Sequence, residues 1–85
     1  MVANESPFAD LALTPTERRL LDTLRAHPDR VFSRRELIEL AMPGTIVLER
    51  TIDVHIRGLR KKLGAHAQLI GTVRRSGYCY RPPNT

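Results

Sequence analysis

Apolar residues recur at helical spacing in the second half of the chain. In ERTIDVHIRGLRKKLG, residues Ile52, Ile56, Leu59 and Leu63 lie at i, i+4, i+7 and i+11, which is the spacing of one helical stripe. At about 100° per residue, these four positions fall within roughly 60° of one another. Arginines, a lysine and one valine occupy the opposite side. The pattern predicts a helix over 48–63 with one face in a core and a positively charged face outside.

An earlier helix is predicted by the sequence LTPTE. Thr14 stands at the N-cap and Glu17 three residues later, so each side chain can satisfy an otherwise unpaired backbone amide of the first turn. Pro15 suits the first helical position, and Pro28 predicts the end of this helix near residue 26. The face expected to be buried comprises Leu20, Leu21 and Leu24.

The sequence SRRE repeats this capping signal. Ser33 at the N-cap and Glu36 three residues later predict a short second helix that ends before Pro43. The apolar residues expected on this helix are Leu37, Ile38, Leu40 and Ala41. A loop over 42–47 follows, and it is unusually apolar for a loop.

The sequence LIGTVRRSGYCYR predicts a β-hairpin. Residues that favour strands occupy 70–73 and 78–80, on either side of a basic tip at 74–77. Gly64 is well placed to end the preceding helix, and two prolines after residue 81 end the hairpin.

The two ends of the chain carry weaker signals. We expect residues 1–10 to be a flexible segment, residues 11–82 to form one domain, and residues 83–85 to be a tail. Leu11 and Leu13 alternate with a small residue, which predicts one short strand over 8–13.

The charge of the chain indicates a polyanionic partner. The net charge is +5 and the isoelectric point is about 10.4. Residues 1–47 carry six Lys or Arg and seven Asp or Glu, whereas residues 48–85 carry eight and two. Because the positive charge is concentrated in the second half, it indicates a binding surface for nucleic acid.

Other classes of protein find little support in the sequence. Cys79 is the only cysteine, so the chain can form no internal disulfide and suits the cytoplasm. The three histidines lie on separate elements and make no zinc pattern, and no Gly-rich phosphate loop occurs. No apolar run approaches the length of a membrane span. We therefore expect no metal, no cofactor, no membrane contact and no catalytic site.

Three helices followed by a hairpin is the element order of the winged helix-turn-helix, an α+β fold. In this fold the second helix crosses the DNA backbone, the third enters the major groove, and the hairpin, or wing, can reach an adjacent minor groove. The helix over 48–63 is then the recognition helix, and residues 74–77 form the tip of the wing.

Four segments resemble a known family in series. LTPTERRLLDTL, HPDRVFSRREL, RTIDVHIRGLRKKLG and TVRRSGYCYRP are similar, in that order, to the effector domain of OmpR/PhoB-family response regulators. The resemblance covers about residues 13–82. It implies a transcription regulator of a two-component system that binds specific DNA sequences and is not an enzyme.

The resemblance also implies roles for single residues. Positions that contact or face DNA in the family fall on Arg50, Thr51, Asp53, Val54, His55, Arg57 and Arg60. Arg34 and Tyr78 fall on positions linked to phosphate contacts, and Arg74 falls on a wing arginine that enters the minor groove. The loop Met42, Pro43, Gly44, Thr45, Ile46 and Val47 corresponds to the segment that touches RNA polymerase. Family members also bind repeated half-sites as tandem pairs.

Several residues admit a second interpretation. Arg60 either contacts DNA or forms a salt bridge back to its own domain, and Val54 either meets a thymine methyl or is simply exposed. Asp53 precedes Arg57 by four residues and is expected to orient its guanidinium. Lys61 and Arg75 are phosphate contacts or ordinary solvated charges.

The sequence departs from the family pattern in three places. Only 12 residues precede LTPTE, where the family has a four-stranded sheet, so this sheet is expected to be missing or reduced to one strand. No receiver domain is present, which fits either a fragment or a stand-alone regulator. Gly58 replaces a frequent base-reading arginine, and Met42 a frequent tryptophan, which leaves the base preference and the polymerase contact open.

Two other functions compete with specific DNA binding. The domain could act mainly as a protein-binding module that docks on RNA polymerase through the loop over 42–47. Alternatively, it could bind DNA without sequence preference, as an architectural protein.

Overall fold

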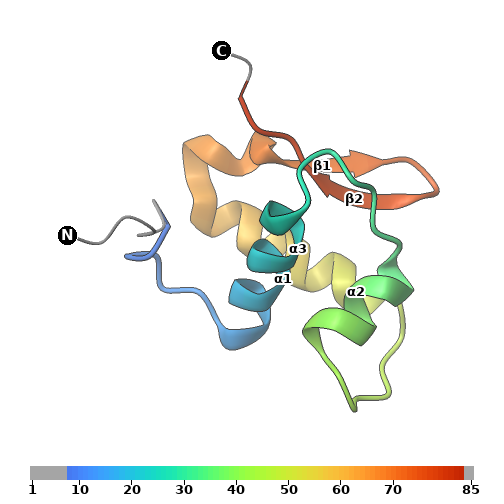
Figure 1. Cartoon of the computed structure of the whole chain (residues 1–85). Helices are drawn as coiled ribbons and strands as arrows, with labels where there is room; N and C mark the ends of the chain where they lie inside the picture. The colour runs from blue at the N-terminus through green and yellow to red at the C-terminus, as the bar shows by residue number, and fades with distance from the viewer. Residues whose placement is uncertain (1–7, 84–85) are drawn as a thin grey trace.

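The predicted order of elements is confirmed by a computed structural model, which describes residues 8–83 (Figure 1). Helices α1 (Pro15–Ala26), α2 (Arg34–Ala41) and α3 (Arg50–Leu63) are followed by a 3₁₀ helix, η1 (Gly64–Leu69). Strands β1 (Ile70–Val73) and β2 (Gly77–Tyr80) then form an antiparallel hairpin, in which Ile70 lies opposite Tyr80. The expected flexible segment and tail lie largely outside the described residues.

Both predicted capping boxes are present. The amide of Glu17 donates to Thr14 Oγ1 over 3.1 Å, and the amide of Thr14 donates to Glu17 Oε1 over 2.9 Å. Ser33 and Glu36 make the same reciprocal pair at the start of α2, over 3.0 and 2.8 Å. Four amides at the starts of these helices are thereby satisfied within a few residues of the chain, so both helices begin where the sequence predicts.

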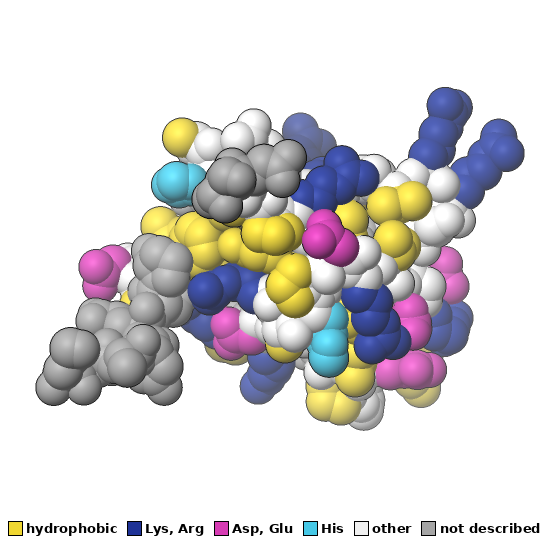
Figure 2. All heavy atoms as spheres, turned by 45° about the horizontal axis from the view of Figure 1, so that its top comes forward, with side chains coloured by type: hydrophobic (Ala, Val, Ile, Leu, Met, Phe, Trp, Pro, Cys, Tyr) yellow, Lys and Arg dark blue, Asp and Glu magenta, His cyan; other side chains and the backbone are white. Residues whose placement is uncertain are grey.

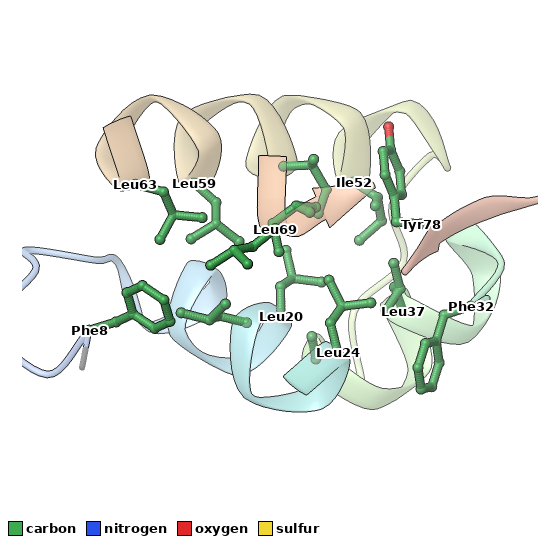
Figure 3. Close-up of a cluster of buried hydrophobic side chains, with 14 of the residues drawn as sticks. Phe8, Leu20, Leu24, Phe32, Leu37, Ile52, Leu59, Leu63, Leu69 and Tyr78 are labelled. Atoms are coloured by element: carbon green, nitrogen blue, oxygen red, sulfur yellow. The ribbon is translucent and has the colours of Figure 1, made fainter. Parts of the chain in front are cut away.

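The core is mostly aliphatic and lies between the three helices and the hairpin (Figure 3). All four residues of the predicted α3 stripe are buried. Leu20, Leu21 and Leu24 of α1 face them with no exposed surface. On α2, Leu37, Ile38 and Ala41 are buried, but Leu40 is 54% exposed. Leu40 lies on the predicted helix but is an exposed apolar residue, because α2 turns it away from α1 and α3.

The prediction of a strand over 8–13 is wrong. The amide of Leu11 bonds the carbonyl of Phe8 and the amide of Leu13 bonds that of Leu11, so the backbone of this segment turns on itself. The only sheet among residues 8–83 is the two-stranded hairpin. The guanidinium of Arg18 holds the segment by donating to the Phe8 and Leu11 carbonyls over 3.2 and 3.1 Å.

Phe8 extends the packed domain further toward the N-terminus than the expected boundary at residue 11. Its side chain is 5% exposed and belongs to the core. Its ring stands edge-on to His66, with 6.0 Å between the ring centroids. Phe8 thus closes the end of the core where Leu63 lies (Figure 3).

The ends of α3 differ slightly from expectation. The helix begins at Arg50 rather than at 48, and Glu49 at the N-cap makes no capping hydrogen bond through its side chain. Gly64 ends it with φ of +58°, a conformation that favours glycine. The 3₁₀ helix that follows was not predicted. No helix among residues 8–83 is long and apolar enough to cross a membrane.

A buried carboxylate joins α1 to α3. Glu17 is 5% exposed, and Lys62 donates to its Oε1 over 2.7 Å. A side chain at Gly58 would place its Cβ 2.7 Å from Glu17 Oε2, which is closer than van der Waals contact allows. Gly58 therefore makes room for the Glu17 carboxylate beside α3, and sequence spacing alone did not reveal this packing role.

The Glu17 carboxylate should make stability depend on acid. Burial raises its pKa, but hydrogen bonds from Lys62 and from the Thr14 amide outweigh this and hold the pKa below its ordinary value of 4.5. A lowered pKa contributes stability above pH 4.5 that is lost as pH falls through the folded-state pKa. We expect the free energy of unfolding of the wild type to be about 1 kcal/mol higher than that of Glu17→Gln at pH 6. Urea unfolding between pH 6 and 3 should show this gap closing, and a constant gap would contradict the assignment.

Candidate nucleic-acid interface

The outer face of α3 and the tip of the wing carry basic side chains that are exposed. These side chains belong to Arg50, Arg57, Lys61, Arg74 and Arg75. Within residues 8–83, none of these five side chains forms a hydrogen bond or an ion pair with another part of the protein. Figure 2 shows basic side chains projecting at the end of the molecule where the hairpin tip lies. This surface is positively charged and available to a negatively charged partner.

The wing tip is a tight turn that points its arginines outward. The Ser76 amide donates to the Val73 carbonyl over 2.9 Å, and Arg75 has φ of +67°. At the base of the tip, the amide of Tyr78 donates to the Phe32 carbonyl and the amide of Phe32 donates to the Tyr78 carbonyl, over 3.0 and 2.8 Å. The segment before α2 is thus attached to β2, so the wing and α2 are held together by backbone bonds.

A shallow cavity lies between the start of α2 and the wing. Its lining includes Ser33, Arg34, Arg35, Arg75 and Tyr78. Backbone amides at a helix N-terminus and nearby arginines favour an anion, which suits a DNA phosphate. Arg35 was not predicted at this surface, although its position beside Arg34 in SRRE was an available signal. Arg35 also lies 3.6 Å from Glu49.

Asp53 does not orient Arg57, as the four-residue spacing had suggested. Its Oδ1 instead accepts from Arg34 Nε over 2.8 Å and from the Tyr78 hydroxyl over 2.5 Å. Arg34 and Tyr78 take the place that the spacing had given to Arg57, because α2 and β2 bring their side chains to Asp53. Burial raises the pKa of Tyr78 above 10, and the hydrogen bond to Asp53 raises it further. The hydroxyl therefore remains a donor throughout the physiological pH range.

Arg60 is turned back toward its own domain. Its guanidinium donates to the Ile70 carbonyl from Nη2 over 2.7 Å and to Thr72 Oγ1 over 2.7 Å. It also lies over the Tyr78 ring, 5.6 Å from the centroid. Of the two interpretations of Arg60, an intramolecular contact is the one present, although its partners are β1 and β2 and not a carboxylate.

The remaining predicted positions on α3 are open to a ligand. Val54 is 68% exposed on the same face as Arg50 and Arg57, and an exposed valine between cations suits an apolar patch such as a thymine methyl. Thr51 and His55 are half-buried along one edge of the helix.

The loop over 42–47 divides into an anchored part and a free part. Met42 and Val47 pack against the core, and Thr45 Oγ1 donates to the Met42 carbonyl over 2.6 Å. Ile46 is fully exposed, and Leu48 just beyond the loop is 62% exposed. The loop therefore presents one apolar side chain to solvent from a fixed base.

Three helices with a hairpin wing, a fully buried inner face of α3 and free arginines outside define a winged helix-turn-helix DNA-binding domain. Residues 9–80 match the family described as transcriptional regulatory protein, C terminal. The chain belongs to this family, and with it to the OmpR/PhoB-type effector domains, which are DNA-binding domains and not enzymes.

Similar proteins include full-length regulators and isolated domains. The phosphate regulon transcriptional regulatory protein PhoB of Escherichia coli is 43% identical over 81 residues, which cover 92% of this chain and 34% of PhoB. The atypical response regulator ChxR of Chlamydia trachomatis is 36% identical over 77 residues, 89% of this chain and 34% of ChxR. The chain thus spans about a third of the length of these relatives.

Solved structures with the same fold include two DNA complexes. The DNA-binding domain of AdeR, bound to an intercistronic region, superimposes with a TM-score of 0.77 at 38% identity over 85% of this chain and 74% of that one. The DNA-binding domain of Klebsiella pneumoniae RstA, bound to the RstA box, has a TM-score of 0.73 at 32% identity over 86% and 76%.

Proposed function

We propose that this chain binds duplex DNA in a sequence-specific manner and regulates transcription from the site it occupies. One observation carries the proposal: α3 buries its whole apolar stripe and leaves Arg50, Arg57 and Lys61 on its outer face without a hydrogen-bond or ion-pair partner among residues 8–83. A helix of this kind fits the major groove, and the hairpin tip with Arg74 and Arg75 fits the adjacent minor groove. The DNA complexes of AdeR and RstA, which have the same fold, support duplex DNA as the ligand.

The contacts divide into two kinds. Arg34, Arg50, Lys61 and Arg75 are assigned to phosphates, where each positive charge releases counterions and strengthens binding to any sequence. Arg57 and Val54 are assigned to base edges in the major groove, with Thr51 and His55 beside them, and Arg74 to the minor groove. Such a regulator works in the cytoplasm, where the DNA is.

Selection of bound duplexes from a random library at about 0.15 M salt tests this function. We expect an enriched motif, and a repeated half-site within it would show tandem binding and its spacing. Binding without enrichment would replace the proposal with architectural DNA binding. No binding of any duplex would overturn it in favour of a protein-binding module.

A contact with RNA polymerase is a second candidate function, favoured by the fully exposed Ile46 in an otherwise anchored loop. An apolar side chain fixed in this way is suited to a pocket on a protein surface. We expect Ile46→Ser to reduce capture of RNA polymerase by the DNA-bound regulator and to leave DNA affinity unchanged. Equal capture by both proteins would exclude this role for Ile46.

A further inference from the structure

We infer that Asp53 is a positioning residue, which holds the wing and the start of α2 in register with the recognition helix and so sets the sequence specificity of binding. This inference rests on the proposed function. Asp53 lies in the first turn of α3, the helix proposed to enter the major groove.

Three elements of the proposed interface meet at one oxygen atom. Asp53 Oδ1 accepts a hydrogen bond from Arg34 Nε at the start of α2 and another from the Tyr78 hydroxyl on β2. The first contact is charged at both ends, and the second donor is largely buried; hydrogen bonds to a charged partner are the stronger kind. The carboxylate therefore links α3 to α2 and to the wing at the same point.

A second residue of α3, Arg60, also contacts Tyr78. Arg60 lies seven residues after Asp53. Arg60 lies over the Tyr78 ring and donates to β1 through the Ile70 carbonyl and Thr72 Oγ1. Residues seven apart lie on the same side of a helix. Figure 3 shows the side chain of Tyr78 extending alongside α3. Asp53 and Arg60, on one edge of α3, thus both hold the hairpin in a fixed orientation relative to this helix.

A negative charge at this position opposes the binding of DNA by itself. Asp53 lies among the cations that would face phosphate, and its side chain is 36% exposed, so its Coulombic effect on a polyanion is repulsive. Attraction of DNA therefore cannot be its role. Its hydrogen bond instead directs Arg34, whose Nε donates to Asp53 Oδ1 while the side chain is 47% exposed.

Positioning affects specific binding more than non-specific binding. A specific complex requires α3 and the wing to reach their own base pairs at the same time, and preformed geometry lowers the cost of doing so. Phosphate contacts in a non-specific complex tolerate a looser arrangement. Loss of the Asp53 contacts should therefore lower affinity for the selected motif while affinity for unrelated DNA stays constant or rises.

The test compares Asp53→Ala with Glu49→Ala. Glu49 is a second carboxylate at the start of α3, but its ion pair is with the exposed Arg35, and it makes no hydrogen bond or ion pair with the wing among residues 8–83. Both variants remove one negative charge from the same end of α3. We expect Asp53→Ala to lower the ratio of specific to non-specific affinity about tenfold. The loss of base preference should be greatest at the base pairs that the wing contacts. Glu49→Ala should keep both the ratio and the motif.

Two conservative variants separate geometry from charge. Asp53→Asn keeps the Oδ1 acceptor without the charge, so it should retain most of the specificity that Asp53→Ala loses. Tyr78→Phe keeps the ring under Arg60 but removes the hydroxyl donor, so it should lose specificity in part. Should Asp53→Ala fail to fold, Tyr78→Phe decides the matter by the same ratio, because it removes one of the two hydrogen bonds to Asp53. An unchanged ratio in the folded variants that lack the bond would overturn the inference.

Hydrogen exchange in the DNA-free protein gives a readout independent of binding. The amides of β1 and β2 should exchange faster in Asp53→Ala than in wild type or Glu49→Ala. Unchanged exchange would overturn the inference even if specificity fell. Faster exchange in Asp53→Ala, combined with no selected motif for wild type, would mean instead that the proposed function fails while Asp53 still positions the wing.

Discussion

Replacing Gly77 with alanine is expected to separate the wing from the helices and to destabilise the fold by more than about 3 kcal/mol. A Cβ at this position would lie 1.9 Å from the backbone carbonyl oxygen of Phe32. That carbonyl accepts the Tyr78 amide and cannot move away without breaking the bridge between residue 32 and β2. Gly77 also has φ of +140°, which a residue with a Cβ rarely adopts.

Gly64→Ala is the matched control for this substitution. Gly64 also has positive φ, at +58°, but a Cβ there would meet no atom of the described residues within 4 Å. It should therefore show only the conformational cost of about 1 kcal/mol. Urea unfolding of both variants measures the difference, and a loss in Gly77→Ala no larger than in Gly64→Ala would mean that the backbone around Phe32 adapts.

Replacing Arg57 with alanine is expected to lower affinity for the selected motif by about 10- to 100-fold and to relax the preference at one base pair. The Arg57 guanidinium is exposed on the outer face of α3 and has no partner among the described residues. It is therefore available for two parallel hydrogen bonds to a base edge, and alanine leaves that edge unread. Affinity for unrelated duplexes should fall much less.

Lys61→Ala separates base reading from simple charge. Lys61 lies one turn beyond Arg57 on the same face, and its replacement by alanine removes one positive charge, as Arg57→Ala does. We expect uniform weakening across all sequences and a decrease of about 1 in the slope of log affinity against log salt. Titrations of both variants with the selected and a scrambled duplex test this division. A uniform loss in both variants would contradict the assignment of Arg57 to a base.

The local features of this protein were predictable because the groups that determine them are close in the chain. Thr14 and Glu17 satisfy each other's amides across one turn, and so do Ser33 and Glu36. The stripe of α3 is visible because helical periodicity places its residues on one side whatever the helix packs against. The hairpin follows from strand-forming residues on either side of its tip.

The sequence did not reveal the partners of residues that meet across elements. Asp53 was expected to pair with Arg57 within α3 but instead bonds α2 and β2, and Phe8 was expected in a flexible segment but fills the core. In each case a long-range contact prevailed over a local one. The spacing of residues along one element does not indicate which side chains of other elements will contact them.

The sequence by itself therefore determined the helices, the hairpin, the direction in which α3 faces and the positive charge of its outer side, since each depends on neighbours within a few residues. Only the tertiary structure decided which basic side chains are free. Packing β1 and β2 against α3 turns Arg60 inward onto Ile70 and Thr72, and it leaves Arg57 exposed. Two arginines three residues apart on one helix thus differ in role because only one of them lies within reach of the wing.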